Sequence, residues 1–152
     1  MSSLRRARHR DLAPIRKIIN SKNNRPSFGW VMEITLAAAI EAGEARMPRE
    51  HLIVATERGA VVGFCRIYHR RDGQSSLHEI GVSETAQNAG IGSQLITRAI
   101  ELAQKRGQEI VIVKPLTERR RSHGFYRRHG FRKIGTQPAR KRELTVFRKK
   151  LR

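Results

Sequence analysis

The chain has 152 residues, 38% of them apolar, and its 32 lysine and arginine side chains exceed 13 aspartate and glutamate side chains by a net +19. This length predicts one domain over residues 1–152, and without a long apolar run or an apolar leader we expect neither a membrane span nor a secretory signal. With a single cysteine, Cys65, the composition excludes an internal disulfide framework and leads us to expect a cytoplasmic protein.

The positive charge is concentrated at the two ends of the chain. Residues 1–26 carry a net +7 and residues 114–152 a net +13, whereas residues 27–113 carry −1. Such a charge attracts polyanions, so we expect a partner such as DNA, RNA, or a ribosomal or other nucleoprotein surface. The alternative is a solvated basic surface that has no polyanionic partner.

The first half of the chain predicts a strand, two helices and a three-stranded meander, over residues 4–10, 12–19, 31–42, 52–57, 61–67 and 77–82. Asp11 is placed to cap the first helix, in which apolar residues recur at helical spacing. Arg58-Gly59 is a hairpin signal between the first two strands of the meander. Cys65 falls inside a predicted strand, so we interpret it as a small core residue rather than a nucleophile.

The second half predicts a helix, a strand, a basic helix and two strands, over residues 95–103, 110–113, 117–128, 131–134 and 144–147. Gly107 and Gly130 follow the two helices as C-terminal caps. Residues 135–142, which include Pro138 and three basic side chains, are predicted to form a loop. Strands followed by a β-α-β crossover predict an α+β (mixed α/β) fold.

A glycine-rich turn connects the predicted strand Leu77–Val82 to the next helix. Its residues, Gln87-Asn88-Ala89-Gly90-Ile91-Gly92-Ser93, would present free backbone N–H groups at a helix N-terminus, where a phosphate binds well. Because Gly90 and Gly92 lack a Cβ, a ligand can approach the backbone closely there. On its own the pattern is equally consistent with a flexible helix start, and it matches neither the dinucleotide nor the Walker fingerprint.

Two segments, in this order, resemble the GNAT (general N-acetyltransferase) superfamily. Gln87 to Gly92 is similar to its Q/R-x-x-G-x-G/A pyrophosphate loop, and Gly124 to Phe131 resembles its Y-x-x-x-G-F segment. The resemblance covers about residues 50–135 well and the ends loosely. It implies a mixed, mostly antiparallel sheet of about six or seven strands with helices on both faces, in which a splayed parallel strand pair holds acyl-CoA.

The resemblance implies acetyl-CoA as the acyl donor, without a metal. A strand end would bind its pantetheine arm and the turn its pyrophosphate, through Ile80, Gly81, Val82, Gln87, Asn88, Ala89, Gly90, Ile91, Gly92 and Ser93. Tyr126, at the family's tyrosine position, would also contact the cofactor. Arg119 stands where many members have a CoA-contacting asparagine, so it is a candidate for the 3′-phosphate. The histidines show no metal-ligand spacing.

The reaction implied by the resemblance is direct attack of an amine on the acyl carbonyl, which needs a base for the ammonium and a proton donor for the thiolate. Tyr126 is the candidate acid, or else it only packs or binds CoA. Some members carry a glutamate where this chain has Lys114, so Glu79 becomes the candidate base, with Glu118 or a water relay as further options. Because strand side chains alternate, we expect His78 to face away from the slot if Glu79 faces it.

The acceptor side is expected to be cationic. Lys114 and Arg120 are candidate substrate-binding residues and would favour an acceptor that carries phosphates or carboxylates. The alternative is that Arg119 to Arg121 form a solvated helix face or bind CoA. Trp30 lies where the variable acceptor loop of the family sits, so it lines the pocket, stacks on a base, or packs in the core.

Three functions stay open at this point. The first is an N-acetyltransferase for an amine carried by a nucleic acid or nucleoprotein: a modified base, an aminoacyl-tRNA or a ribosomal protein. The second is an acetyltransferase for a small acidic amine metabolite, and the third is a non-catalytic CoA- or nucleic-acid-binding module. The resemblance also implies that a homodimer can form through the C-terminal strands, and we expect no membrane partner.

Overall fold

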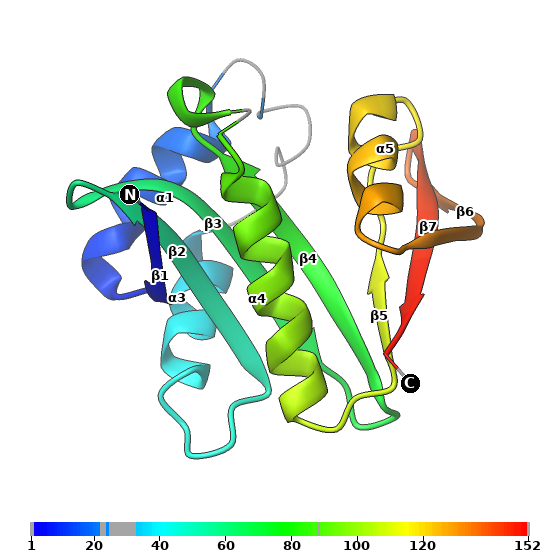
Figure 1. The fold of residues 1–152 in the computed structure, drawn as a ribbon, viewed down its shortest axis with the longest axis horizontal. Helices are drawn as coiled ribbons and strands as arrows, with labels where there is room; N and C mark the ends of the chain where they lie inside the picture. Colours follow the sequence, from blue (N-terminus) through cyan, green and yellow to red (C-terminus); the bar gives the residue numbers. More distant parts are fainter. Residues whose placement is uncertain (1, 22–23, 25–32, 88, 152) are drawn as a thin grey trace.

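The computed structural model of the chain describes residues 2–21, 24, 33–87 and 89–151. In chain order the elements are β1 (Ser2–Arg6), η1 (His9–Asp11), α1 (Leu12–Ile19), α3 (Glu33–Ala42), β2 (Glu50–Glu57), β3 (Ala60–His69), β4 (Gln74–Val82), η2 (Glu84–Ala86), α4 (Ile91–Lys105), β5 (Ile110–Val113), α5 (Arg120–Arg128), β6 (Arg132–Ala139) and β7 (Arg142–Lys150) (Figure 1). The order of helices and strands is the predicted one. None of the described helices is long and apolar enough to cross a membrane.

The described strands form one seven-stranded sheet in the order β1-β2-β3-β4-β5-β7-β6. β4 and β5 pair in parallel, and the other neighbouring strands pair antiparallel. This confirms the predicted mixed, mostly antiparallel sheet.

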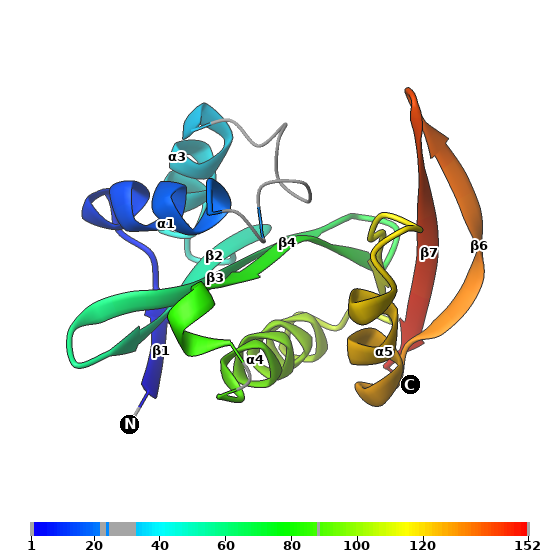
Figure 2. The same ribbon diagram turned by 90° about the horizontal axis from the view of Figure 1, so that it is seen from above.

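Helices cover both faces of the sheet, α1 and α3 on one and α4 and α5 on the other (Figure 2). Successive residues of β2 divide between two apolar clusters, since strand side chains alternate. Leu52 and Val54 pack with α1 and α3, whereas Ile53 and Ala55 pack with α4. Both faces of the central strands are therefore buried.

Asp11 does not cap α1 as predicted. Its carboxylate accepts hydrogen bonds from the Arg8 N–H at 2.7 Å and from two nitrogens of Arg5 at 2.7 and 2.9 Å, which closes the turn η1. Burial alone would raise the pKa of Asp11, but these hydrogen bonds outweigh it and hold that pKa below its usual value. The ion pair ties β1 to the start of α1.

The loop predicted over residues 135–142 is wrong, because β6 continues to Ala139 and β7 begins at Arg142. Pro138 suggested a strand end, since proline cannot donate to a ladder. β6 is the edge strand of the sheet, however, and an edge tolerates proline because one side of it has no partner strand.

Two local predictions are confirmed. Arg58 and Gly59 both have positive φ, 51° and 80°, as a tight turn between β2 and β3 requires. Cys65 is fully buried in the core cluster under α4, and burial raises the pKa of its thiol to about 12. A thiol in that state is a packing group and not a nucleophile.

Candidate active site

The parallel strands β4 and β5 fork partway along their length. Their ladder runs from Gln74–Ile110 to Leu77–Val113, after which β5 ends and β4 continues to Val82 (Figure 1). The last five residues of β4 therefore have β3 on one edge only. The predicted splayed parallel pair lies at this fork.

The open edge of β4 presents the backbone of alternate residues. Ser83 N–H donates to Val62 O at 2.8 Å, and Gly81 lies opposite Phe64. Because hydrogen-bonded pairs alternate along an antiparallel ladder, Gly81 spends its backbone groups on β3, while those of Ile80 and Val82 point toward the fork. Of the three residues predicted to bind a pantetheine arm, two thus have backbone groups on the correct edge.

The carbonyl of Val82 is already bonded inside the protein. It accepts from the side-chain amides of Gln87 at 3.2 Å and Asn24 at 2.9 Å, and Asn24 also donates to Ile18 O at 3.1 Å. The side chain of Gln87, predicted to contact the cofactor, therefore braces the turn against β4. Asn24 fastens the end of α1 to the same point, a contact that the sequence did not suggest.

The glycine-rich turn opens α4 as predicted. Gly90 precedes the helix in the left-handed region with φ 81°, and its carbonyl accepts the first helical bond from Gln94 at 3.1 Å. The N–H groups of Ile91, Gly92 and Ser93 have no carbonyl four residues back within the helix, so they face outward as donors. Ala89 continues the turn, and Asn88 lies outside the described residues.

Gly92 is required by a close contact within the protein. A Cβ at this position would lie 3.2 Å from the ring of Phe125 on α5 and 3.8 Å from Val82 at the end of β4. The start of α4, the middle of α5 and the end of β4 are therefore packed together at one end of the fork. Figure 1 shows α4 and α5 both beginning at this end of the sheet.

Tyr126 lies in the core on the α4 side of the sheet. It is 6% exposed, and its ring packs against Phe131 and Phe147 with centroid distances of 5.8 and 6.1 Å. Burial and the neighbouring Cys65 raise the pKa of its phenol, so the hydroxyl stays protonated at neutral pH. A neutral hydroxyl of this kind can donate a proton or a hydrogen bond.

Glu79 is held by a buried guanidinium. Arg66 on β3 donates through Nε and Nη2 to the two carboxylate oxygens of Glu79 at 2.9 and 3.0 Å, and through Nη1 to Glu50 at 2.6 Å. Burial raises the pKa of Glu79, although Arg66 opposes that change. Both oxygens of the predicted base thus have a cationic partner, and its role as the base stays a prediction.

The expectation that His78 and Glu79 face opposite sides of the sheet is wrong. The register between β3 and β4 shifts after Arg66, so that Arg66 pairs with Glu79 while Ile67 pairs with Leu77. His78 is the extra residue of a β-bulge, which interrupts the alternation. It lines a hollow beside α3 together with Arg66, which also binds Glu79. Sequence alternation could not reveal this, because a bulge depends on how two strands pair.

The predicted substrate-binding residues are placed differently. Lys114 is exposed directly after β5, and its charge acts on His78 across the fork. Arg119 precedes α5 and Arg120 is its exposed first residue, both at the end where α4 begins. Trp30 lies outside the described residues. Glu118 is exposed and pairs with Arg142. Within the described residues, no three His, Cys, Asp or Glu side chains gather as they would around a metal.

Comparison with known proteins identifies relatives for most of the chain. The model of the Acetyltransferase (GNAT) family matches residues 15–131. An aminoalkylphosphonate N-acetyltransferase of Salmonella typhimurium is 30% identical over 90 residues, which make up 56% of this chain and 58% of that protein. The chain spans less than two thirds of the length of the curated relatives it matches.

Solved structures of low sequence identity share the fold. The PaiA N-acetyltransferase of Thermoplasma acidophilum, in complex with coenzyme A, has a TM-score of 0.84 at 15% identity, over 99% of both chains. The ribosomal-protein-S18-alanine N-acetyltransferase of Escherichia coli has a TM-score of 0.79 at 16% identity, over 99% of this chain and 94% of that one.

The cluster of Arg66, Glu50 and Glu79 predicts a pH-dependent stability. Replacing Arg66 with Met leaves two carboxylates partly or fully buried without their cation, so we expect the free energy of unfolding to fall by about 3 kcal/mol. Without Arg66 the pKa of each carboxyl rises in the folded state. The loss is therefore largest at about pH 8 and smaller at about pH 5, where the acids take up protons.

Urea denaturation at both pH values measures the difference. Adding Glu79→Gln to the variant removes one charge and is expected to restore part of the stability at the higher pH. Arg70→Met is the matched control, because it breaks a pair with Asp72 in which both side chains are about half exposed (56% and 47%), and we expect a change within about 0.5 kcal/mol. Equal losses for both arginines, or a loss independent of pH, would contradict the prediction.

Proposed function

The chain belongs to the GNAT acetyltransferase family, and from this membership we propose that it transfers an acetyl group from acetyl-CoA to a primary amine by direct attack. In this reaction the amine nitrogen bonds to the acetyl carbonyl carbon, the C–S bond breaks, and CoA leaves as a thiolate that takes up a proton. Cys65 is buried with a raised pKa, which agrees with a reaction that has no covalent enzyme intermediate.

The observation that supports this proposal most is the fork between β4 and β5 with the start of α4 at its open end. Outward N–H groups and the helix dipole at Ile91 to Ser93 favour a pyrophosphate. From there the open edge of β4 offers the N–H of Val82 and both backbone groups of Ile80 to a pantetheine arm. β4 covers about 13 Å between Val82 and His78, so the arm would run along this edge toward the last rung of the ladder.

Tyr126 is the proposed proton donor to the departing thiolate. Its phenol is protonated at neutral pH and is held in one orientation by Phe131 and Phe147. Arg119 and Arg120, at the start of α5, are proposed to neutralise phosphate groups of CoA, which carry most of its charge. In this arrangement positive charge lies at the nucleotide end of the fork.

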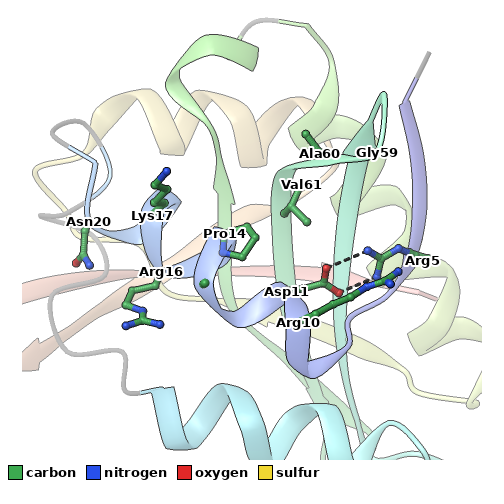
Figure 3. A pocket seen from close by; sticks show the side chains of 11 residues that line it. Arg5, Arg10, Asp11, Pro14, Arg16, Lys17, Asn20, Gly59, Ala60 and Val61 are labelled. Atoms are coloured by element: carbon green, nitrogen blue, oxygen red, sulfur yellow. Dashed lines mark hydrogen bonds and ion pairs between the residues drawn. The ribbon is translucent and has the colours of Figure 1, made fainter.

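We further propose that the acceptor amine is carried by a nucleic acid or a nucleoprotein. The net charge of +19 supports a polyanionic partner. A groove of about 1070 Å³ offers a place for it, between the outer side of α1 and the β2–β3 hairpin (Figure 3). It lies beside α1, on the side of the sheet opposite α4 and α5.

The groove has a cationic rim and a floor of small residues. Figure 3 shows Arg10, Arg16 and Lys17 along α1 and Gly59 to Val61 opposite them. The one acidic side chain among the groove-lining residues, Asp11, is bonded to Arg5. A phosphodiester backbone suits this combination, because small floor residues let it approach and the remaining cations bind successive phosphates.

A second candidate acceptor is a small acidic amine. The specific observation in its favour is the 30% identity to an aminoalkylphosphonate N-acetyltransferase over part of the chain. Lys114 would then bind the acidic group, and the groove along α1 would have no part in the reaction.

The glycine turn gives a direct test of cofactor binding. Gly90→Ala forces a side chain into the left-handed region and costs about 1 kcal/mol of stability. Because it also displaces the N–H donors of the turn, we expect acetyl-CoA binding to weaken about tenfold in isothermal titration calorimetry. Gly59→Ala is the matched control: φ is 80° there against 81°, and neither position has an atom within 4 Å of the new Cβ. Equal acetyl-CoA affinity in the two variants would refute the assignment.

The role of Tyr126 is tested by removing only its hydroxyl. Tyr126→Phe keeps the aromatic packing, so we expect kcat to fall by about a hundredfold while the KM for acetyl-CoA changes little. Release of the CoA thiol measures the rate, with the fastest primary amine of a panel as acceptor. Retention of the full rate would mean that Tyr126 is only a packing residue.

The groove is tested with a fluorescein-labelled single-stranded RNA and fluorescence anisotropy. Arg10→Glu with Lys17→Glu removes two phosphate contacts and adds repulsion, so we expect affinity to fall more than about tenfold and the salt slope to decrease by about 1.4. Arg71→Glu with Lys133→Glu makes the same change in net charge at exposed sites away from the groove, and we expect less than about a threefold loss. Equal losses would show that RNA responds to overall charge, and no RNA binding by the unaltered protein would favour the small acidic amine.

A further inference from the structure

The bulge in β4 turns His78 toward a hollow of about 520 Å³ on the α3 side of the sheet. Leu77 packs into the core on the α4 side and Glu79 bonds to Arg66, so His78 is the inserted residue between two regular positions. The hollow is lined by Thr35, Ala38, Glu50, Arg66, Tyr68 and His78. The imidazole lies near the ring of Tyr68, with a centroid distance of 6.5 Å, and stays accessible to solvent.

His78 also occupies the point where the fork begins. Leu77–Val113 is the last rung of the parallel ladder, so His78 is the first residue of β4 without a partner on β5. A pantetheine arm that follows the open edge from Val82 ends at this residue. The imidazole therefore lies where a thioester arriving along the edge would meet a group in the hollow.

The wall of the hollow carries a net negative charge. One guanidinium, that of Arg66, is paired with two carboxylates, Glu50 and Glu79. The charge left over favours a cation, and the face of Tyr68 adds a second cation-binding surface. This differs from the expected cationic acceptor side, because Lys114 lies across the fork at the end of β5 and not among the residues that line the hollow.

His78 is a neutral imidazole under these conditions. Partial burial, with Arg66 and Lys114 adding to it, lowers the pKa of His78 to about 4. The charged and titratable groups around it are Arg66 and Tyr68 from β3, Glu50 from β2, Glu79 from β4 itself and Lys114 after β5. Among the described residues, none forms a hydrogen bond with its ring nitrogens, so at neutral pH one of them has a lone pair able to accept a proton.

We propose that this hollow is the acceptor site, that it takes a primary ammonium borne on an uncharged body, and that His78 is the catalytic base that removes the proton. This inference rests on the proposed acetyltransferase function and names the acceptor chemistry of the same site. A carboxylate or phosphate next to the amine would meet Glu50 and Glu79 and be disfavoured. The polyanionic carrier would bind the groove along α1, and only its neutral, amine-bearing end would enter the hollow.

The proton and electron balance of the step is complete. A ring nitrogen of His78 takes one proton from the ammonium, and the freed lone pair attacks the acetyl carbonyl carbon. The C–N bond forms, and the second amine proton leaves as the C–S bond breaks. The thiolate receives a proton from Tyr126, whose hydroxyl is restored by one of the two protons released from the amine. The other proton passes from the accessible imidazole to solvent.

The base is tested by a pH profile. With the unaltered protein and 2-phenylethylamine as acceptor, we expect kcat/KM to be nearly flat between about pH 6 and pH 8, since the neutral imidazole accepts the proton throughout. In His78→Gln the rate should fall about a hundredfold at neutral pH and rise about tenfold per pH unit, because only the free amine then reacts. His78→Ala should regain rate when imidazole is added, which a structural histidine would not do.

His9→Gln is the matched control, because His9 is an exposed histidine on η1 outside the hollow, and its profile should stay that of the unaltered protein. A flat profile in His78→Gln, or no response of His78→Ala to imidazole, would overturn the assignment of the base. Isothermal titration with acetyl-CoA accompanies each variant. Unchanged binding with altered rates isolates His78, whereas loss of binding by the unaltered protein would be a failure of the proposed function itself.

The acceptor chemistry is tested by competing amines. We expect 2-phenylethylamine and an alanyl peptide amide to exceed glycine and 2-aminoethylphosphonate by at least about tenfold in kcat/KM. Glu50→Gln keeps the hydrogen bond to Arg66 but removes a charge, so this preference should shrink. A preference for glycine or the phosphonate, or acetyl-CoA binding with turnover of none of the four, would overturn the acceptor site as described.

Discussion

The functional part of this protein depends on one limit to strand pairing: the parallel ladder between β4 and β5 ends at Leu77–Val113. A longer β5 would cover the edge of β4 and leave no backbone groups for a ligand. Because β5 stops, the N–H and C=O groups of Ile80 and the N–H of Val82 need another partner, since unpaired backbone groups are costly when water is excluded. An extended, amide-containing ligand is a natural partner for such an edge, and the start of α4 at its far end adds a site for phosphate.

The bulge next to the last rung gives that edge its chemistry. An unbroken alternation would have placed His78 on the α4 side, within a core of apolar side chains. The inserted residue turns it to the α3 side instead, next to Tyr68 and the cluster of Arg66 with two carboxylates. The same shift places Glu79 on Arg66. One irregularity in pairing therefore separates an accessible imidazole from a carboxylate that is fully bonded.

Charge is distributed so that attraction and selection occur in different places. The overall excess of +19 and the groove along α1 act on a polyanion over distances near a Debye length. The hollow beside α3 has a local excess of negative charge and acts on a single ammonium in contact. A carrier rich in phosphate and an amine without a neighbouring anion are thus compatible demands on one acceptor.

Local patterns in the sequence determined much of the fold and the location of the cofactor end of the site. Gly90 and Gly92 before an amphipathic helix, the short apolar run Ile110–Val113, and Tyr126 four residues before Gly130 depend on neighbours in the chain, so their spacing alone placed them. The register of β3 against β4, the pairing of Arg66 with Glu50 and Glu79, and the extension of β6 through Pro138 depend on contacts between distant segments. Only the tertiary structure decided these, because a side chain's face and its ionic partners are set by the strand that lies beside it.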